Sequence, residues 1–331
     1  MAEDVFRVTG DAGRVIAVDL GGTNIRVALV DTNGGTTGFV ATPTGAAEGP
    51  GAVVSRILLM IRDSLAAAQM DASEVLAVGI GSPGPLDRIS GVIHEAPNLP
   101  GWTNVRLADR IAEQVKLPVF LENDANAAAL AEFSYGENRG TDNMLYITVS
   151  TGVGGGLILG GKLWHGVYGS AGEFGHMTVD FEGPLCDCGN RGCIEKISSG
   201  PDVADWSIEQ VRSGAKSVLS ARMESGPLSG RDVVEAAAKD DSLAVAALGR
   251  AGRAVGFGIV NVAHLLNLDL AVVGGGMANA GAMLLDPIKT TVTTHLLAST
   301  GPSLRVVPWS LGEDVGVLGA AASARARMAG L

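Results

Sequence analysis

Residues 15–30 read VIAVDLGGTNIRVALV. An apolar run broken only by Asp19 precedes the pair Gly21 and Gly22, and β-branched residues follow, so a strand is expected on each side of a glycine turn. A Rossmann motif needs a helix after the turn and a P-loop needs a lysine, so neither motif fits. What remains is a hairpin whose unobstructed N–H groups and Thr23 hydroxyl can approach phosphate oxygens. Asp19 is placed there to hold a hydrated magnesium ion.

The same order of elements returns later in the chain. A strand expected over residues 144–149 runs into a second turn, which begins at Thr151 and Gly152, and the apolar run 157–159 follows. A plain hairpin is the alternative for either turn taken alone. The repetition instead favours two related lobes, each offering backbone N–H groups toward a space between them.

Helices and strands alternate through the rest of the chain. Apolar spacing and composition indicate helices at residues 52–69, 107–115, 124–133 and 315–328. Short apolar runs indicate strands at residues 39–41, 75–80, 118–121, 270–273 and 304–307. This alternation is typical of the α/β class.

Two domains are expected, with a boundary near Asn123. Residues 1–123 form a small α/β lobe, which the carboxy-terminal helix of residues 312–331 is expected to complete. Residues 124–311 form a large α/β lobe that carries the cysteine-rich loop. The polar stretch 213–231 is expected to be a surface connection.

All three cysteines of the chain lie in the run CDCGNRGC, residues 186–193, shortly after His176. Three thiolates and one imidazole are a tetrahedral ligand set for zinc, and a single ion can fix a loop that has no core of its own. Unrelated buried or redox cysteines are the alternative. The close spacing and the glycines at the turns weaken it. We therefore predict zinc bound by His176, Cys186, Cys188 and Cys193.

Asp124 opens an expected helix directly after a strand. Aspartate is a favoured N-cap, so a structural role is the first alternative. Its neighbours Glu122, Asn123 and Asn126 form a polar cluster at the carboxyl end of a strand, which is the edge where open α/β sheets bind ligands. Asp124 is thus a candidate general base beside the candidate phosphate turns.

Further hydrogen-bonding groups surround the cysteine-rich loop, namely Glu173, His176 and Glu195, and Asn98 adds another in a proline-bounded loop. Such a set suits a ligand with many hydroxyl groups. A third glycine cluster covers residues 274–276. Three interpretations remain for it, namely a turn that binds a dinucleotide, a surface that contacts adenosine, and simple close packing of the backbone. The remaining histidines have no ligand-like spacing and are assigned no role.

Charge and composition exclude several classes of partner. The chain has 24 basic and 35 acidic residues, a formal net charge of −11, which repels nucleic acids and anionic membranes. The acidic amino terminus lacks the apolar core of a signal peptide, and no apolar stretch is expected to span a membrane. With reduced, metal-binding cysteines, a cytoplasmic location is expected.

Taken together, these motifs resemble the ROK family of repressors and sugar kinases, and within it the bacterial glucokinases. The resemblance spans nearly the whole chain. It rests on the order and spacing of the runs VIAVDLGGTNIRVALVD, GSPGPLD, NLPGW, LENDANAAALAE, TVSTGVGGGLILGGKLWHG, AGEFGH and CDCGNRGCIEKISSG. The fold it implies is the actin-like ATPase, or ribonuclease H-like, fold, with two lobes around a central cleft.

The resemblance also implies a role for individual residues. Asp124 matches the general base of the family. The first phosphate site corresponds to Asp19, Gly21, Gly22 and Thr23, the second to Thr151 and Gly152, and the region near adenosine to Gly275 and Gly276. The sugar contacts correspond to Gly84, Asn98, Asn123, Asp124, Glu173, His176 and Glu195, and the zinc ligands to His176, Cys186, Cys188 and Cys193. His176 then serves both the metal and the sugar.

The function expected from this resemblance is transfer of the γ-phosphoryl group of ATP, with Mg²⁺, to the C6 hydroxyl of glucose. Other ROK substrates, namely N-acetylmannosamine, N-acetylglucosamine, mannose and fructose, remain alternatives, as do polyphosphate as the donor and a non-catalytic sugar-sensing regulator. The segment before the first strand is expected to be too short for a DNA-binding domain. A homodimer or homotetramer is expected by resemblance.

Overall fold

The computed structural model describes residues 13–96, 98–300 and 304–330, so the expectation about the amino-terminal segment lies largely outside the described residues. The chain forms two compact units. Unit 1 holds the residues up to Gly140 together with Gly161–Ala171 and Ser310 onward, and unit 2 holds Thr141–Gly160 and Gly172–Trp309. These units differ from the expected division at residue 123, because helix α3 (Asp124–Tyr135) packs along helix α10 (Val315–Met328) inside unit 1.

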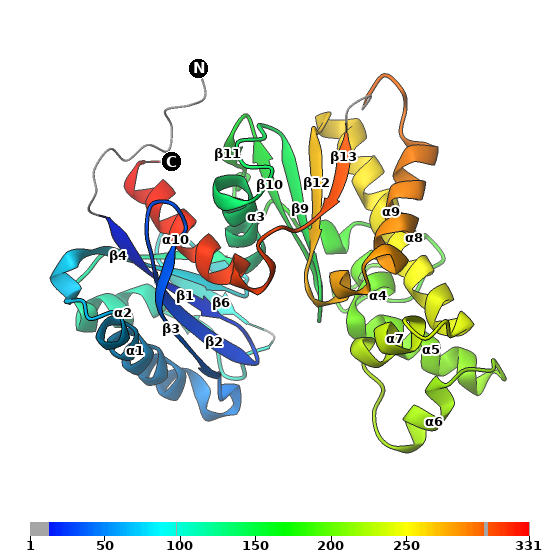
Figure 1. Ribbon diagram of the computed structural model, residues 1–331, viewed down its shortest axis with the longest axis horizontal. Helices are drawn as coiled ribbons and strands as arrows, with labels where there is room; N and C mark the ends of the chain where they lie inside the picture. The colour runs from blue at the N-terminus through cyan, green and yellow to red at the C-terminus, as the bar shows by residue number, and fades with distance from the viewer. Residues whose placement is uncertain (1–12, 97, 301–303, 331) are drawn as a thin grey trace. The chain divides into compact units, whose positions relative to one another are not determined.

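Unit 1 is built on a five-stranded sheet (Figure 1). Its strand order is β3 (Thr36–Pro43), β2 (Asn24–Val30), β1 (Arg14–Leu20), β4 (Val75–Ser82) and β8 (Val119–Asn123). Strand β2 is antiparallel to both β1 and β3, whereas β1, β4 and β8 are parallel. A three-stranded antiparallel sheet, β5 (Leu86–Asp87), β6 (Val92–Glu95) and β7 (Thr103–Val105), belongs to the same unit.

Both faces of β1 are buried, which explains its almost continuous apolar sequence. Ile16 and Val18 belong to a core that includes side chains of helices α1 (Gly49–Ala67) and α2 (Leu107–Val115). Val15 and Ala17 belong instead to a core formed with α3 and α10. The sheet of unit 1 is therefore a middle layer between two pairs of helices.

Unit 2 repeats this arrangement. Strands β10 (Val153–Leu159), β9 (Met144–Val149), β12 (Leu270–Gly274) and β13 (Arg305–Pro308) follow one another in the sheet, with β9 and β10 antiparallel and the other neighbours parallel. The order and directions match those of β2, β1, β4 and β8. The internal repeat expected from the sequence is confirmed.

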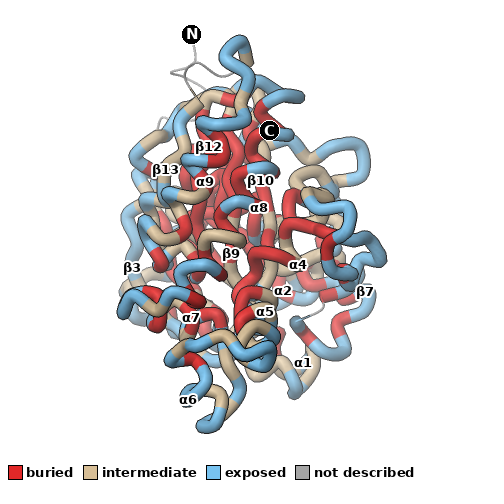
Figure 2. Tube along the Cα trace, turned by 90° about the vertical axis from the view of Figure 1, so that its right-hand side faces the viewer, coloured by how far each residue is buried: buried red, intermediate tan, exposed pale blue. Residues whose placement is uncertain are grey.

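Helices of unit 2 pack on this sheet and on one another. They are α4 (Glu195–Ser198), α5 (Gly200–Arg212), α6 (Leu219–Glu224), α7 (Gly230–Ala237), α8 (Ser242–Leu266) and α9 (Ala282–His295). The expected surface connection over residues 213–231 contains α6, whose Leu219 is 2% exposed and joins the core. Figure 2 shows long buried stretches along β9, β12 and α8.

Among the described residues, α8 is the helix whose length and hydropathy would allow it to cross a membrane. Of its most apolar window, 67% is buried within the protein, as in the core helix of a globular unit.

Candidate active site and metal centre

The first glycine turn is held firmly within unit 1. The Gly21 N–H donates to the Asn24 carbonyl over 3.0 Å, and the Thr44 hydroxyl donates to the Gly21 carbonyl over 2.6 Å. Thr23 itself is exposed, so its hydroxyl is available to a ligand. The turn has the fixed backbone and free donor group that phosphate binding requires.

Asp19 lies directly opposite Arg26 in the β1–β2 ladder, and the Arg26 Nη1 atom is 3.1 Å from Asp19 Oδ2. Burial raises the pKa of Asp19, and the Arg26 guanidinium opposes that rise. The Oδ1 atom is the oxygen that Arg26 does not engage, so it is the one left for a hydrated cation. Arg26 is not among the site residues predicted from the sequence. It could have been predicted as the charged residue in an apolar strand that lies opposite Asp19 in the hairpin register.

Gly22 brings the phosphate turn against the loop that carries Asn98. A Cβ atom on Gly22 would lie 2.8 Å from the Asn98 Cβ and 3.2 Å from its carbonyl oxygen. The Asn98 side chain is exposed. Two elements that were predicted separately, a phosphate turn and a sugar contact, are thus in van der Waals contact within unit 1.

This contact makes Gly22→Ala a test of the site. We expect the added methyl group to displace Asn98 and lower kcat/KM for glucose by on the order of 10²-fold, because a shift of about 1 Å in a positioning group has that effect. Gly51→Ala is the matched control, since a Cβ there meets no atom within 4 Å. Steady-state kinetics of both variants give the answer. Equal kcat/KM values in the two would contradict a role for the Gly22–Asn98 contact.

The start of α3 rules out the alternative role of Asp124 as the helix cap. Asn123 is the N-cap, because its Oδ1 atom accepts from the N–H groups of Ala125 and Asn126 over 3.0 and 3.2 Å. The alternative that Asp124 caps the helix is therefore wrong. Asn123 keeps its Nδ2 atom for a ligand, and a Cβ on Gly84 would lie 3.6 Å from that atom.

Asp124 is the first residue of α3, and its side chain is accessible to solvent. Its Oδ1 atom accepts from the Ala125 N–H over 2.8 Å. Desolvation by the surrounding protein, assisted by the negative charge of Asp19, raises the pKa of the Asp124 carboxyl to about 6. A carboxylate with this pKa and free access is suited to accept a proton near neutral pH.

The raised pKa gives a pH prediction. A general base acts when deprotonated, so kcat/KM for glucose should rise with pH up to about 6 and level off above it. The half-buried Asp19, whose pKa is also raised, steepens the acid limb. The measurement is kcat/KM between pH 4.5 and 8 under conditions where the protein stays folded. A profile that is flat through pH 6 would argue against Asp124 as the base.

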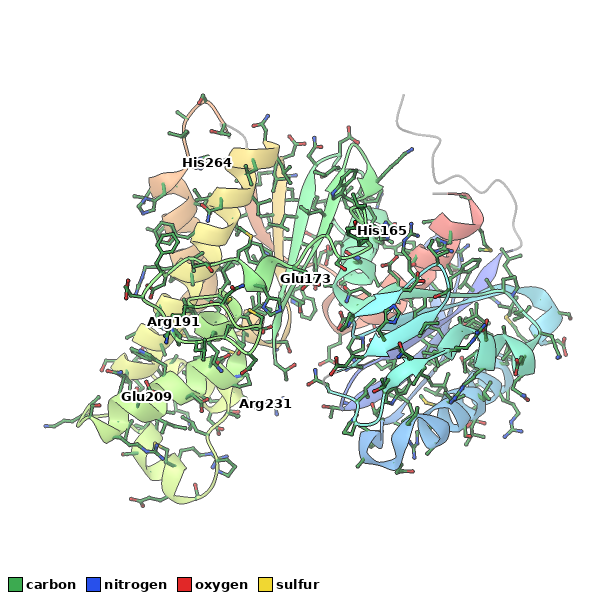
Figure 3. The ribbon with its side chains drawn as sticks, turned by 180° about the vertical axis from the view of Figure 1, so that it is seen from behind. His165, Glu173, Arg191, Glu209, Arg231 and His264 are labelled. Carbon is green, nitrogen blue, oxygen red and sulfur yellow. The ribbon has the colours of Figure 1, made fainter. Side chains whose placement is uncertain are left out.

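Glu122, just before the cap, is 2% exposed and has three hydrogen-bonding partners. It accepts from the Asn123 N–H over 3.1 Å and from Asn126 Nδ2 over 3.2 Å, and its Oε2 atom is 2.9 Å from Nε2 of His165. No role for His165 is expected from the sequence. The structure places this side chain, labelled in Figure 3, as the partner of a buried carboxylate next to the candidate base.

In unit 2, the second glycine turn meets Glu195. The turn is closed by a 2.8 Å hydrogen bond from the Ser150 N–H to the Gly152 carbonyl, and Thr151 is exposed. Glu195, at the start of α4, accepts from the Val153 N–H over 2.8 Å. A Cβ on Gly152 would lie 2.7 Å from Glu195 Oε2. The predicted phosphate turn and a predicted sugar contact are again neighbours.

Gly275 and Gly276 lie where β12 ends and a 3₁₀ helix begins. Gly275 has φ +87°, and a Cβ on it would lie 2.7 Å from Thr148 Oγ1. Backbone conformation and close packing therefore account for this glycine. Gly276 is less crowded, with Ser150 Oγ at 3.5 Å from such a Cβ. That adenosine binds near Gly275 and Gly276 stays a prediction.

The cysteine-rich loop gathers all four predicted zinc ligands. One ligand atom from each of His176, Cys186, Cys188 and Cys193 lies within 4.8 Å of all the others. The Cys188 and Cys193 sulfurs are 3.6 Å apart, and the Cys186 sulfur is 3.9 Å from His176 Nδ1. A tetrahedral zinc ion with Zn–S bonds of about 2.3 Å holds its sulfurs about 3.8 Å apart. The geometry of this loop therefore fits zinc.

Electrostatics of the thiols agree with a cation at the centre of the cluster. Burial and the neighbouring thiols raise the pKa of Cys193 to about 12, and burial also raises the pKa of Cys186. The Asn190 amide lowers the pKa of Cys188 to about 7. Three thiolates in contact repel one another, so the donor set needs a positive ion to be charged together.

The loop that gathers the predicted zinc ligands also carries two predicted sugar contacts. His176 ends the 3₁₀ helix Phe174–His176, and Glu173 directly precedes it, exposed and making no capping bond (Figure 3). With Nδ1 turned toward the cysteines, His176 has Nε2 left for a ligand. The predicted residues thus fall into two groups. Unit 1 holds the first phosphate turn, Gly84, Asn98, Asn123 and Asp124, and unit 2 holds the second turn, Glu173, Glu195, the glycine pair and the metal ligands.

Comparison with known proteins identifies the family. The model of the ROK family matches residues 15–327. The glucokinase of Halalkalibacterium halodurans is 37% identical over 308 residues, which cover 92% of each chain. A ROK family glucokinase from Streptomyces griseus, solved with glucose and AMPPNP, is 34% identical with a TM-score of 0.79, covering 93% of this chain and 98% of that one.

Regulators of the same family are also similar in structure. A ROK family transcriptional regulator, a homologue of the E. coli MLC protein, has a TM-score of 0.84 at 28% identity, over 97% of this chain and 80% of its own. The actin-like α/β fold expected from the sequence is confirmed by these neighbours. On the extent of the match and the level of identity, this chain belongs to the ROK family.

Proposed function

We propose that this chain is an ATP-dependent glucokinase that transfers the γ-phosphoryl group of ATP to the C6 hydroxyl of glucose. The observation that carries the proposal is the state of Asp124, an accessible carboxylate with a pKa near 6 at the start of a helix whose cap is made by its neighbour. The glucokinases at 34–37% identity over most of the chain support the substrate and the donor.

In the proposed reaction, Asp124 accepts the proton of the C6 hydroxyl as that oxygen attacks the γ-phosphorus. The bond from the γ-phosphorus to the β–γ bridging oxygen breaks, and ADP leaves with that oxygen. The Gly21 N–H closes the first turn, so the charge on the phosphoryl oxygens is stabilised by the backbone N–H groups of Gly22 and Thr23 and by those of Thr151 and Gly152. Asn98, Asn123 and Glu173 orient the sugar hydroxyls.

Two metals belong to the proposal in different ways. Asp19, through its Oδ1 atom, is the residue that would hold hydrated Mg²⁺, which neutralises phosphate charge in phosphoryl transfer. Zinc is structural. It would fix the loop that carries His176 and, through Cys193 next to Ile194, the start of α4 with Glu195.

A coupled assay for ADP over a panel of hexoses tests the proposal. Glucose should give the highest kcat/KM among glucose, mannose, fructose, N-acetylglucosamine and N-acetylmannosamine. A higher value for another sugar would keep the kinase and replace its substrate, because the polar contacts discriminate weakly between hexoses. Polyphosphate in place of ATP completes the panel as an alternative donor.

A sugar-responsive regulator without catalysis is the second candidate, favoured by the similarity to the ROK regulator. It predicts sugar binding without ADP formation. We place the protein in the cytoplasm, as a homodimer or homotetramer. The acidic net charge of −11 supports a partner set of sugar and ATP rather than nucleic acid or anionic membrane.

A further inference from the structure

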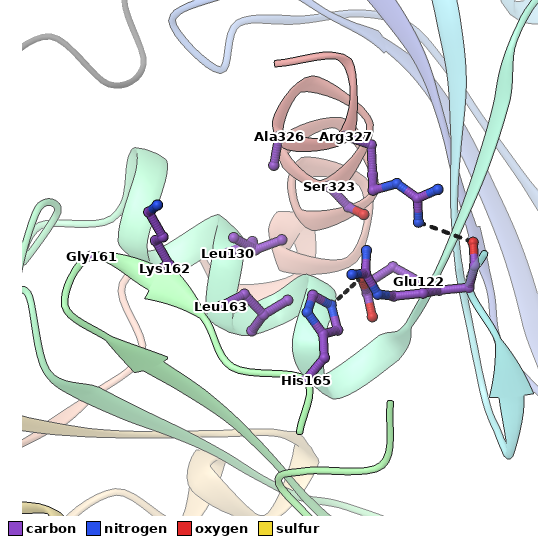
Figure 4. Close-up of a pocket in the computed structure, with 10 residues that line it drawn as sticks. Glu122, Leu130, Gly161, Lys162, Leu163, His165, Ser323, Ala326 and Arg327 are labelled. Atoms are coloured by element: carbon purple, nitrogen blue, oxygen red, sulfur yellow. Dashed lines mark hydrogen bonds and ion pairs between the residues drawn. The ribbon is translucent and has the colours of Figure 1, made fainter. Parts of the chain in front are cut away.

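Unit 1 contains a cavity of about 170 Å³ that the proposed reaction does not use (Figure 4). Its wall is formed by α3, α10, the end of β8, the short strand β11 (Lys162–Leu163) and the turn after β5. The polar lining consists of Arg88, Glu122, Lys162, His165, Ser323 and Arg327.

Three permanent cations line this cavity. Within residues 13–96, 98–300 and 304–330, no carboxylate lies within 4.0 Å of the charged nitrogens of Arg88, Lys162 or Arg327. Arg327 Nη1 donates to the Arg88 carbonyl over 3.1 Å, so this bond holds the guanidinium in place without neutralising it. Burial, together with the like charge of Arg88, lowers the pKa of Arg327, and the charges of Glu122 and Asp87 oppose this shift in part. Arg88 and Arg327 are thus held close together at an electrostatic cost that an anion would relieve.

The acid in the lining, Glu122, offsets only part of this positive charge. Glu122 already accepts hydrogen bonds from the Asn123 N–H, from Asn126 Nδ2 and from His165. Both of its carboxylate oxygens are therefore engaged by these three groups. Figure 4 shows the ion pair with His165 on the cavity wall. The cavity therefore keeps a net positive lining, even with Glu122 ionised.

We propose that this cavity binds a small phosphate dianion, either inorganic phosphate or the phosphate group of a small monoester. The Arg327 guanidinium supplies planar paired donors, the Lys162 ammonium supplies a mobile charge, and the Ser323 hydroxyl of α10 supplies a neutral donor. Three cations with a hydroxyl match a doubly charged tetrahedral group better than a single carboxylate. Through His165 and Glu122, the site is connected to the segment that carries Asn123 and Asp124.

Calorimetric titration with inorganic phosphate tests this site without relying on kinase activity. The protein is first saturated with glucose and AMPPNP, so that phosphate-binding positions of the proposed active site are filled. We expect wild-type protein to bind one phosphate at millimolar concentration. Lys162→Gln and Arg327→Gln should each weaken binding by on the order of tenfold, the usual effect of losing one charge-assisted hydrogen bond. Lys239→Gln, an exposed site in unit 2, is the matched control and should bind as wild type does.

Lys162 is exposed, so the Lys162→Gln variant is expected to fold. Arg327 also stacks over Phe120, so the Arg327→Gln variant is expected to be less stable, and Lys162→Gln keeps the test valid in that case. A titration with glycerol 3-phosphate shows whether the site binds inorganic phosphate or a phosphate monoester. If glycerol 3-phosphate binds more tightly than inorganic phosphate does, the site is one for a monoester. Absence of phosphate binding by the wild type, or equal affinity in wild type, Lys162→Gln and Lys239→Gln, would overturn the proposal. The comparison between variants holds even if the proposed kinase activity is wrong.

Discussion

Replacing Asp124 with asparagine is expected to lower kcat for glucose phosphorylation by on the order of 10³-fold, because the variant loses the proton acceptor for the C6 hydroxyl. The helix start should survive the change. An amide oxygen can accept from the Ala125 N–H as Asp124 Oδ1 does, and the cap is provided by Asn123. Glucose affinity is therefore expected to stay within a few fold of the wild type.

The Asp124→Asn experiment separates catalysis from binding. ADP release in the coupled assay reports turnover, and calorimetry reports the Kd for glucose. Asp109→Asn, on the exposed side of α2, is the matched control for loss of one negative charge. A variant with normal turnover would remove Asp124 from the mechanism. A wild type that binds glucose without turnover would favour the regulator.

Loss of the metal centre should have the second largest effect. Cys193 is 0% exposed, and its sulfur lies 3.6 Å from that of Cys188 within the cluster. Cys193→Ser removes a thiolate ligand, so we expect the protein to lose its zinc and the loop to loosen. Because Glu173, His176 and Glu195 depend on that loop, kcat/KM should fall by on the order of 10²-fold.

Metal analysis together with kinetics measures this effect. Asp187→Asn lies in the same loop, is exposed and is no ligand, so it should keep both zinc and activity. Dialysis against a chelator should reproduce the Cys193→Ser result, and added zinc should restore activity to the wild type but not to the variant. A zinc-free wild type with full activity would show that the metal does not position the site.

Much of the fold was predictable because its signals are local. The hairpins at residues 15–30 and 144–159 are marked by apolar strands around glycine turns, and their repetition revealed the two related sheets. Helices α2 and α10 have the predicted ends. Apolar spacing marks α2, whereas α10 is buried continuously from Val317 to Ala326. The grouping of the four predicted zinc ligands could be predicted from their spacing, because they lie close together in sequence.

The features that escaped prediction depend on tertiary contacts. His165 and Glu122 are 43 positions apart, and no local pattern links them. Asn123 and Asp124 are both favourable cap residues, so sequence alone could not show which one ends the strand and caps α3. Helix α6 was missed because its surroundings are polar, while its burial rests on Leu219 packing into a distant core.

The most direct test of the account is a structure of this protein with glucose and AMPPNP bound. We predict that one carboxylate oxygen of Asp124 lies roughly 2.6–3.2 Å from the C6 hydroxyl oxygen, the distance at which proton transfer is feasible. The γ-phosphorus should be in line with that hydroxyl. A bound sugar whose C6 hydroxyl lies beyond hydrogen-bonding reach of Asp124 would contradict the proposed mechanism.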